Sequence, residues 1–164
     1  MFNALIAAML LQVAGAAPDA RPAIVSPPAE LSGWTSPRPL DAGRTAERAT
    51  VLTLGVAVAA RLPSTRDVRY VVRPEKPGGS VSYGGVFAFT VTTPGRYRIA
   101  LGSGAWIDVL AEGRPAISVA HGHGPACTGI RKMVDFDLGV GRYVLQVAGN
   151  GTANLPLLVT KLPA

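Results

Sequence analysis

Two stretches with the same pattern decide the fold: FTVTTPGRYRIAL at residues 89–101 and FDLGVGRYVLQV at residues 136–147. Each has a short apolar run, a turn with glycine, and then Gly-Arg-Tyr leading into a run in which alternate residues are apolar. Glycine permits the backbone to reverse, and a period of two places alternate side chains on one face of a strand. We therefore predict two β-hairpins whose second strands supply two stripes of one apolar core. The stripes are Tyr97, Ile99 and Leu101, and Tyr143, Leu145 and Val147.

Further short runs of apolar or alternating residues lie on both sides of these stretches, bounded by Gly, Pro, Asn or Ser. The predicted strands cover residues 52–58, 70–72, 86–91, 96–101, 106–111, 117–120, 133–138, 142–147 and 155–160. The sequence has no convincing amphipathic helical pattern. Many short strands separated by turn signals indicate an all-β domain, and we predict an antiparallel β-sandwich.

The repeated pattern of strand, glycine turn, Gly-Arg-Tyr and strand resembles the hairpins of known sandwich families. It is similar to jelly-roll domains and to the pre-peptidase C-terminal (PPC-like) domains of secreted bacterial proteins, over residues 86–160. The resemblance implies a β-sandwich. It implies no particular function, since one fold carries many functions.

The N-terminus has the pattern of a secretory signal. Residues 1–16 contain no charged side chain, and the apolar run at residues 4–13 is followed by Ala-Gly-Ala. We expect cleavage after Ala16, a periplasmic or secreted location, and no membrane span after cleavage, because the apolar run is shorter than a bilayer needs.

Residues 17–48 are rich in proline, which removes backbone donors and disfavours helix, so we predict an extended leader. Leu31 and Trp34 are expected to pin part of this leader to the domain, and a short helical turn is expected at residues 45–49. The sandwich domain is predicted to cover residues 49–164.

The chain is basic and almost free of cysteine. Its 164 residues include 16 Lys and Arg against 10 Asp and Glu, which gives a formal net charge of +6. This balance favours an anionic partner such as lipopolysaccharide or polysaccharide. Nucleic acid is not an expected partner, because no basic run is interleaved with aromatic residues. Cys127 is the only cysteine, so no intramolecular disulfide can form and the fold depends on its core.

One stretch has the residue types that hold metals, His121-Gly-His123-Gly-Pro-Ala-Cys127. If the strand beginning at residue 117 continues to residue 123, both imidazoles lie on one face about 7 Å apart, and Cys127 can fold back as a third ligand for zinc or copper. Arg131 and Lys132 follow and are candidates to bind an anionic ligand. Candidates for a fourth metal ligand are Asp108, Glu112, Asp135 and Asp137.

Two other interpretations of the same stretch are open. In one, the histidines cap a surface turn and Cys127 is buried as a small apolar residue. In the other, Cys127 is a reactive thiol whose thiolate is favoured by His121, His123, Arg131 and Lys132.

A second resemblance rests on residues 76–85 (KPGGSVSYGG), residues 102–108 (GSGAWID) and residues 121–132. These stretches resemble a group of small exported bacterial proteins that carry the name homogentisate 1,2-dioxygenase. The dioxygenase family of that name has a much longer cytoplasmic chain with a cupin core, and it holds iron(II) with two histidines and a glutamate. The resemblance implies an iron site at His121 and His123, completed by Glu112 or an aspartate, and ring cleavage of an aromatic diol.

We expect a binding or accessory module rather than an enzyme, with a metal or anionic ligand at His121, His123 and Cys127. The alternative is the metal-dependent dioxygenase. No Gly-x-Ser-x-Gly motif is present to indicate a serine hydrolase.

Overall fold

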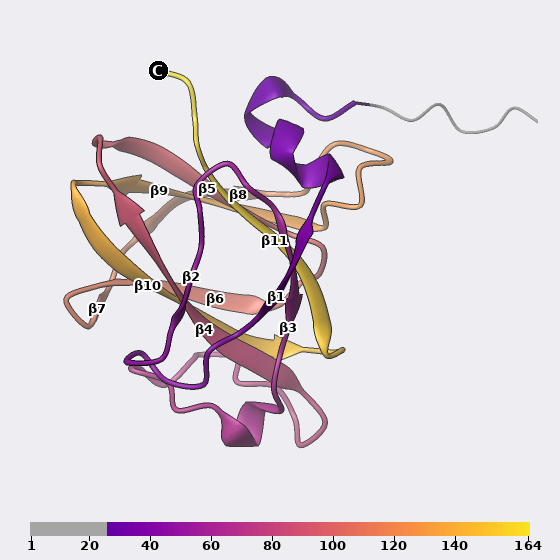
Figure 1. The fold of residues 1–164 in the computed structure, drawn as a ribbon, viewed down its shortest axis with the longest axis vertical. Helices are drawn as coiled ribbons and strands as arrows, with labels where there is room; N and C mark the ends of the chain where they lie inside the picture. The colour runs from indigo at the N-terminus through magenta and orange to yellow at the C-terminus, as the bar shows by residue number, and fades with distance from the viewer. Residues whose placement is uncertain (1–25) are drawn as a thin grey trace, which may run out of the picture.

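Two sheets packed face to face make up most of the computed structural model, which describes residues 26–164 (Figure 1). The six-stranded sheet contains, in spatial order, β1 (Arg38–Asp41), β3 (Val58–Arg61), β11 (Asn154–Lys161), β5 (Gly95–Leu101), β9 (Lys132–Leu138) and β8 (Ser118–Gly122). The five-stranded sheet contains β2 (Thr50–Val51), β4 (Tyr83–Val91), β10 (Gly141–Asn150), β6 (Trp106–Ala111) and β7 (Arg114–Pro115). Two short 3-10 helices complete the described elements, η1 (Ala29–Thr35) and η2 (Thr65–Asp67). The predicted all-β sandwich is confirmed.

The core prediction is also confirmed. All six residues of the two predicted stripes belong to one buried apolar cluster between the sheets. Within it, the rings of Phe89 and Tyr143 stack with their centroids 5.5 Å apart. At the start of β5 and of β10 burial alternates as the sequence pattern predicts, and further along each strand consecutive residues are buried on both faces.

The two predicted hairpins are wrong. β4 and β5 belong to different sheets, and so do β9 and β10, so each repeated stretch is an arch that crosses from one sheet to the other. The two arches pair with each other instead, β4 with β10 and β5 with β9. An alternating strand buries the same residues whether its partner is near or distant in sequence, so the pattern does not distinguish a hairpin from an arch.

A matching tyrosine closes each arch at its corner. The Tyr97 hydroxyl donates to the carbonyl of Thr93 at 2.7 Å, and the Tyr143 hydroxyl donates to the carbonyl of Gly139 at 3.0 Å. Each bond reaches back four residues across the corner, as in the tyrosine corners of other sandwiches. Gly95 and Gly141 are the first residues of these strands and have φ of 153° and 157°, backbone conformations that side chains disfavour.

The sandwich is antiparallel except at one edge of each sheet. β1 pairs with β3 in parallel, and β2 pairs with β4 in parallel. The chain between β1 and β3 passes through β2 in the other sheet, so it is long enough to return to the same end of the first sheet. Parallel pairing needs such a long connection.

Part of the proline-rich segment is built into the sandwich. Leu31 and Trp34 of η1 are buried against Ala100 and Leu158 on the outer side of the six-stranded sheet, as predicted. The Trp34 indole also donates to the carbonyl of Thr128 at 2.8 Å. Residues 29–35 form a 3-10 helix rather than extended chain, and residues 45–49 form a turn with two i to i+3 bonds rather than a helix. The predicted signal at residues 1–16 and the first part of the leader lie outside the described residues.

Two predicted strands are largely absent. Residues 52–57 form no strand, and neither do residues 70–72. The buried Gln146 side chain replaces a strand partner there: its Oε1 accepts from the amides of Val71 and Val72, and its Nε2 donates to the Val72 carbonyl at 3.1 Å. Between residues 26 and 164, no helix is both long enough and apolar enough to span a bilayer.

Candidate functional site

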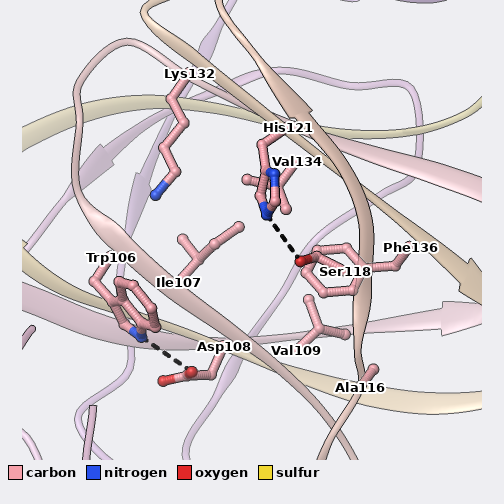
Figure 2. Close-up of a pocket in the computed structure, with 10 residues that line it drawn as sticks. All are labelled: Trp106, Ile107, Asp108, Val109, Ala116, Ser118, His121, Lys132, Val134 and Phe136. Carbon is pink, nitrogen blue, oxygen red and sulfur yellow. Dashed lines mark hydrogen bonds between the residues drawn. The ribbon is translucent and has the colours of Figure 1, made fainter. Parts of the chain in front are cut away.

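A cavity of about 180 Å³ opens between the two sheets on the side where β8 and β9 face β6 (Figure 2). Its apolar wall comes from both sheets. That wall contains Ile107, Val109, Ala116, Val134 and Phe136. Its polar lining contains Trp106, Asp108, Ser118, His121 and Lys132.

A β-bulge in the edge strand β8 turns two polar side chains inward. Ser118 pairs with Phe136 and His121 pairs with Val134, with a register shift between residues 118 and 120. Directly paired residues share a face of the sheet, and both partners belong to the core, so Ser118 and His121 lie on the inward face. Three residues apart, they would lie on opposite faces of a regular strand, so the bulge is what brings them together. His121 Nε2 lies 3.2 Å from Ser118 Oγ.

Lys132 begins β9 in the same inward row as Val134 and Phe136. Its side chain extends towards the Trp106 ring (Figure 2), with Nζ 5.7 Å from the ring centroid and donating to the Ala105 carbonyl at 2.8 Å. Burial, followed by the charge of Lys76, lowers the pKa of the Lys132 ammonium, and Asp108 opposes that shift. The Lys76 ammonium also lies 5.7 Å from the Trp106 ring centroid.

The carboxylate of Asp108 is already engaged. Its Oδ1 accepts from the Trp106 indole at 3.0 Å, and its Oδ2 accepts from Gln146 Nε2 at 3.4 Å. In residues 26–164 the ion pairs within 4.0 Å are Arg61 with Asp41, Arg96 with Asp137 and Arg98 with Asp135. Lys132 therefore faces the cavity without a carboxylate in contact.

The structure brings together only part of the set predicted from sequence. His121 and Lys132 line the cavity, whereas His123, Cys127 and Arg131 do not. β8 ends at Gly122, so His123 leaves the strand, and its Nδ1 lies 3.0 Å from the Arg131 carbonyl. Cys127 is exposed with φ of 63°, so the interpretation in which it is a buried apolar residue is wrong.

The predicted metal ligands are not gathered. Across the described part of the chain, no group of three or more His, Cys, Asp or Glu side chains is placed to hold a metal ion. The residues present thus fit neither the zinc or copper set at His121, His123 and Cys127 nor an iron site of two histidines and a carboxylate. No step through a metal follows from this geometry.

Three residues of the site were missed from the sequence: Lys76, Trp106 and Ser118. A strand pattern assigns inward positions to apolar residues, and the unpredicted bulge concealed that Ser118 occupies one. Lys76 and Trp106 had no local signal, because the stretches at residues 76–85, 102–108 and 121–132 meet beside the Trp106 ring only in the folded chain.

No protein-family model matches this chain, and no curated protein matches it either. The functional interpretation therefore rests on the geometry of the cavity and on the chemistry of the residues around it.

Proposed function

We propose that this chain is an exported binding module whose ligand is a small organic carboxylate held in the cavity between β6, β8 and β9. The observation that carries the proposal is that Ser118, His121 and Lys132 occupy inward positions of the sandwich. Ser118 and Lys132 are half-buried and His121 is exposed at the sheet edge, and all three have hydrogen-bond partners. They nevertheless displace the apolar side chains that inward positions ordinarily carry. A ligand that uses these groups explains why they replace apolar residues.

The chemistry of the lining selects an anion with an apolar body. The Lys132 ammonium has three donors, one of which is bonded to the Ala105 carbonyl, so the others are free for a carboxylate. A bound anion also offsets the repulsion between Lys132 and Lys76. The Ser118 hydroxyl supplies a further polar contact, and Ile107 and Phe136 form the wall for a ring or branched chain.

The volume supports a ligand of few atoms. Sites for drug-sized molecules have volumes of roughly 300 to 1,000 Å³, and this cavity has about 180 Å³. One ring or one branched aliphatic acid is the expected size. A polysaccharide chain is too large for this cavity.

Binding rather than catalysis is assigned to the site. Ser118 and His121 make the contact that a nucleophile and its base need, but among the described residues no third side chain orients the imidazole. The exported location is supported by the uncharged, apolar residues 1–16.

The test uses Trp106 as its own reporter. In the Trp34→Phe variant Trp106 is the only tryptophan, and its fluorescence is followed during titration with benzoate and with isovalerate. Saturable changes are expected with one or both acids and not with benzylamine. No saturable change up to about 10 mM of either acid, a binding free energy of under about 3 kcal/mol, contradicts the proposal.

A matched pair of substitutions then locates the site. Lys132→Gln removes the cation from the cavity and is expected to weaken binding at least about tenfold, the size of a lost charge-assisted hydrogen bond. Arg131→Gln removes the same charge from the neighbouring exposed residue, which lies outside the cavity, and is expected to leave binding unchanged. Equal losses in both variants would show that net charge, rather than the cavity, attracts the ligand.

A further inference from the structure

Three arginines from two segments of the chain line one surface hollow of about 620 Å³. Arg44 and Arg48 belong to the connection between β1 and β2, and Arg69 follows η2. These segments lie at the end of the sandwich away from η1 (Figure 1). The hollow is separate from the cavity at Lys132, with which it shares no lining residue.

Backbone bonds fix the segments that carry these arginines. The amide of Arg69 donates to the carbonyl of Arg44 at 2.8 Å, which joins the two segments directly. Gly43 exchanges two backbone bonds with Val86 of β4, at 3.1 and 2.8 Å, and so anchors the connection to the five-stranded sheet. The arginine side chains are therefore presented from an ordered frame.

These arginines are distinguished by sharing one hollow, since six other arginines within residues 26–164 also form no ion pair. Within residues 26–164, Arg44, Arg48 and Arg69 form no ion pair, although three other arginines are each paired with an aspartate. Asp41 also lines the hollow, but its carboxylate is bonded to Arg61 at 3.1 Å. Two unpaired carboxylates oppose the three guanidinium groups, Asp67 in the lining and the neighbouring Glu47. The pKa of Glu47 is lowered first by a hydrogen bond with Thr45 and to a smaller extent by the charge of Arg69.

We propose that this hollow binds a multiply charged oxyanion of the phosphate class. A guanidinium presents a planar fork of donors that matches two oxygens of one anion. A carboxylate has only two oxygens and is satisfied by one or two forks, whereas a phosphate group has enough oxygens and charge for all three. The phosphate can belong to a soluble phosphate or to a lipid headgroup, and the chemistry recognised is the same.

The experiment compares four forms of the chain by calorimetric titration with inorganic pyrophosphate and by sedimentation with vesicles of phosphatidylglycerol or phosphatidylcholine. The wild-type chain is expected to give one of two results. Saturable binding of pyrophosphate indicates a soluble phosphate ligand. Sedimentation with phosphatidylglycerol vesicles but not with phosphatidylcholine vesicles indicates a lipid headgroup. The variant Arg44→Gln/Arg48→Gln/Arg69→Gln is expected to lose at least about tenfold of that affinity, the size of a lost charge-assisted hydrogen bond.

The matched control is Arg114→Gln/Arg131→Gln/Arg142→Gln, which removes the same charge from exposed arginines elsewhere and is expected to keep the affinity. Lys132→Gln is also expected to keep it, which separates this site from the carboxylate cavity. Unfolding midpoints of all variants verify that the fold persists. Absence of any saturable binding by the wild-type chain, or equal losses in the site variant and its control, would overturn the proposal.

Discussion

The two arches differ from the side of the sandwich where the cavity opens between β6, β8 and β9, here called the open side, in the residues that occupy inward positions. The arch strands β4, β5, β9 and β10 fill theirs with buried aromatic and aliphatic side chains, and the polar groups of Tyr97 and Tyr143 are satisfied at the corners. On the open side, β8 and the start of β9 present Ser118, His121 and Lys132 to a cavity. The first region is built for stability, and the second gives up apolar contacts for groups that can bind.

This difference implies that different residues determine the stability of the fold and the affinity for ligand. Substitutions in the arches should reduce the free energy of unfolding and leave the ligand preference alone. Substitutions on the open side should change ligand affinity at little cost to stability, a pattern common where function requires unfavourable placements. Three measurements test the separation.

The largest effect is expected at Leu145 of β10. Leu145→Ala removes a fully buried side chain from the arch core and should lower the free energy of unfolding by about 3 kcal/mol. Ile107→Ala removes the same number of carbons from a side chain that already borders the cavity, so it loses fewer contacts, and about 1 to 2 kcal/mol is expected. Urea unfolding measures both.

Val140→Ala is the surface control for these two variants. Val140 is 67% exposed at the corner of the second arch, so its truncation should change stability by under about 0.5 kcal/mol. If Leu145→Ala and Ile107→Ala lower the free energy of unfolding equally, the proposed contrast between the two regions is wrong.

A smaller effect is expected from the charges on the outer face of the arch strands. Arg98 pairs with Asp135 at 2.7 and 2.8 Å and Arg96 pairs with Asp137 at 2.9 and 3.2 Å, across the same two strands. The Asp135 side chain is 6% exposed and that of Asp137 is 57% exposed. Asp135→Asn should therefore lower the free energy of unfolding by about 2 kcal/mol, because it leaves the partly buried Arg98 guanidinium without its anion.

Asp137→Asn is the matched comparison and should cost clearly less, since solvent screens an exposed pair. The Arg96 guanidinium lowers the pKa of Asp137, so the contribution of this pair is present above the ordinary pKa of a carboxylate and is lost as the pH falls through the lowered value. The stability difference between wild type and Asp137→Asn should accordingly disappear in acid. If Asp137→Asn lowers the free energy of unfolding more than Asp135→Asn does, the ranking of the two ion pairs by their burial is wrong.

The arches were predictable as strands because alternation is a local property of the sequence. The runs at residues 86–91, 96–101, 106–111, 133–138, 142–147 and 155–160 all lie within observed strands. Their partners were not predictable, because hairpin and arch bury the same side chains. Residues 52–57 alternate as a strand does, yet they form none.

The site was predictable only where it coincided with a visible cluster of residues. His121 and Lys132 were identified because histidine and lysine stood near a lone cysteine, and Arg131 was included with them although it does not line the cavity. Ser118 depended on a bulge, and Trp106 with Lys76 depended on contacts between segments distant in sequence. Such contacts are set by the tertiary fold and leave no local pattern.

The smallest effect on stability, and the sharpest test of the comparison, is expected at Lys132. Lys132→Met keeps most of the side-chain volume and removes a partly desolvated charge, so the urea midpoint at neutral pH should be equal to or higher than that of wild type, while carboxylate binding is lost. In the wild type, burial lowers the pKa of Lys132, so the folded chain binds fewer protons there than the unfolded chain as the pH rises. Its stability relative to Lys132→Met should therefore increase as the pH rises through the lowered pKa towards the ordinary pKa of a lysine. If Lys132→Met is markedly less stable than wild type at neutral pH, Lys132 stabilises the fold. The open side would then contribute to stability as the arches do, and the contrast between the two regions would be wrong.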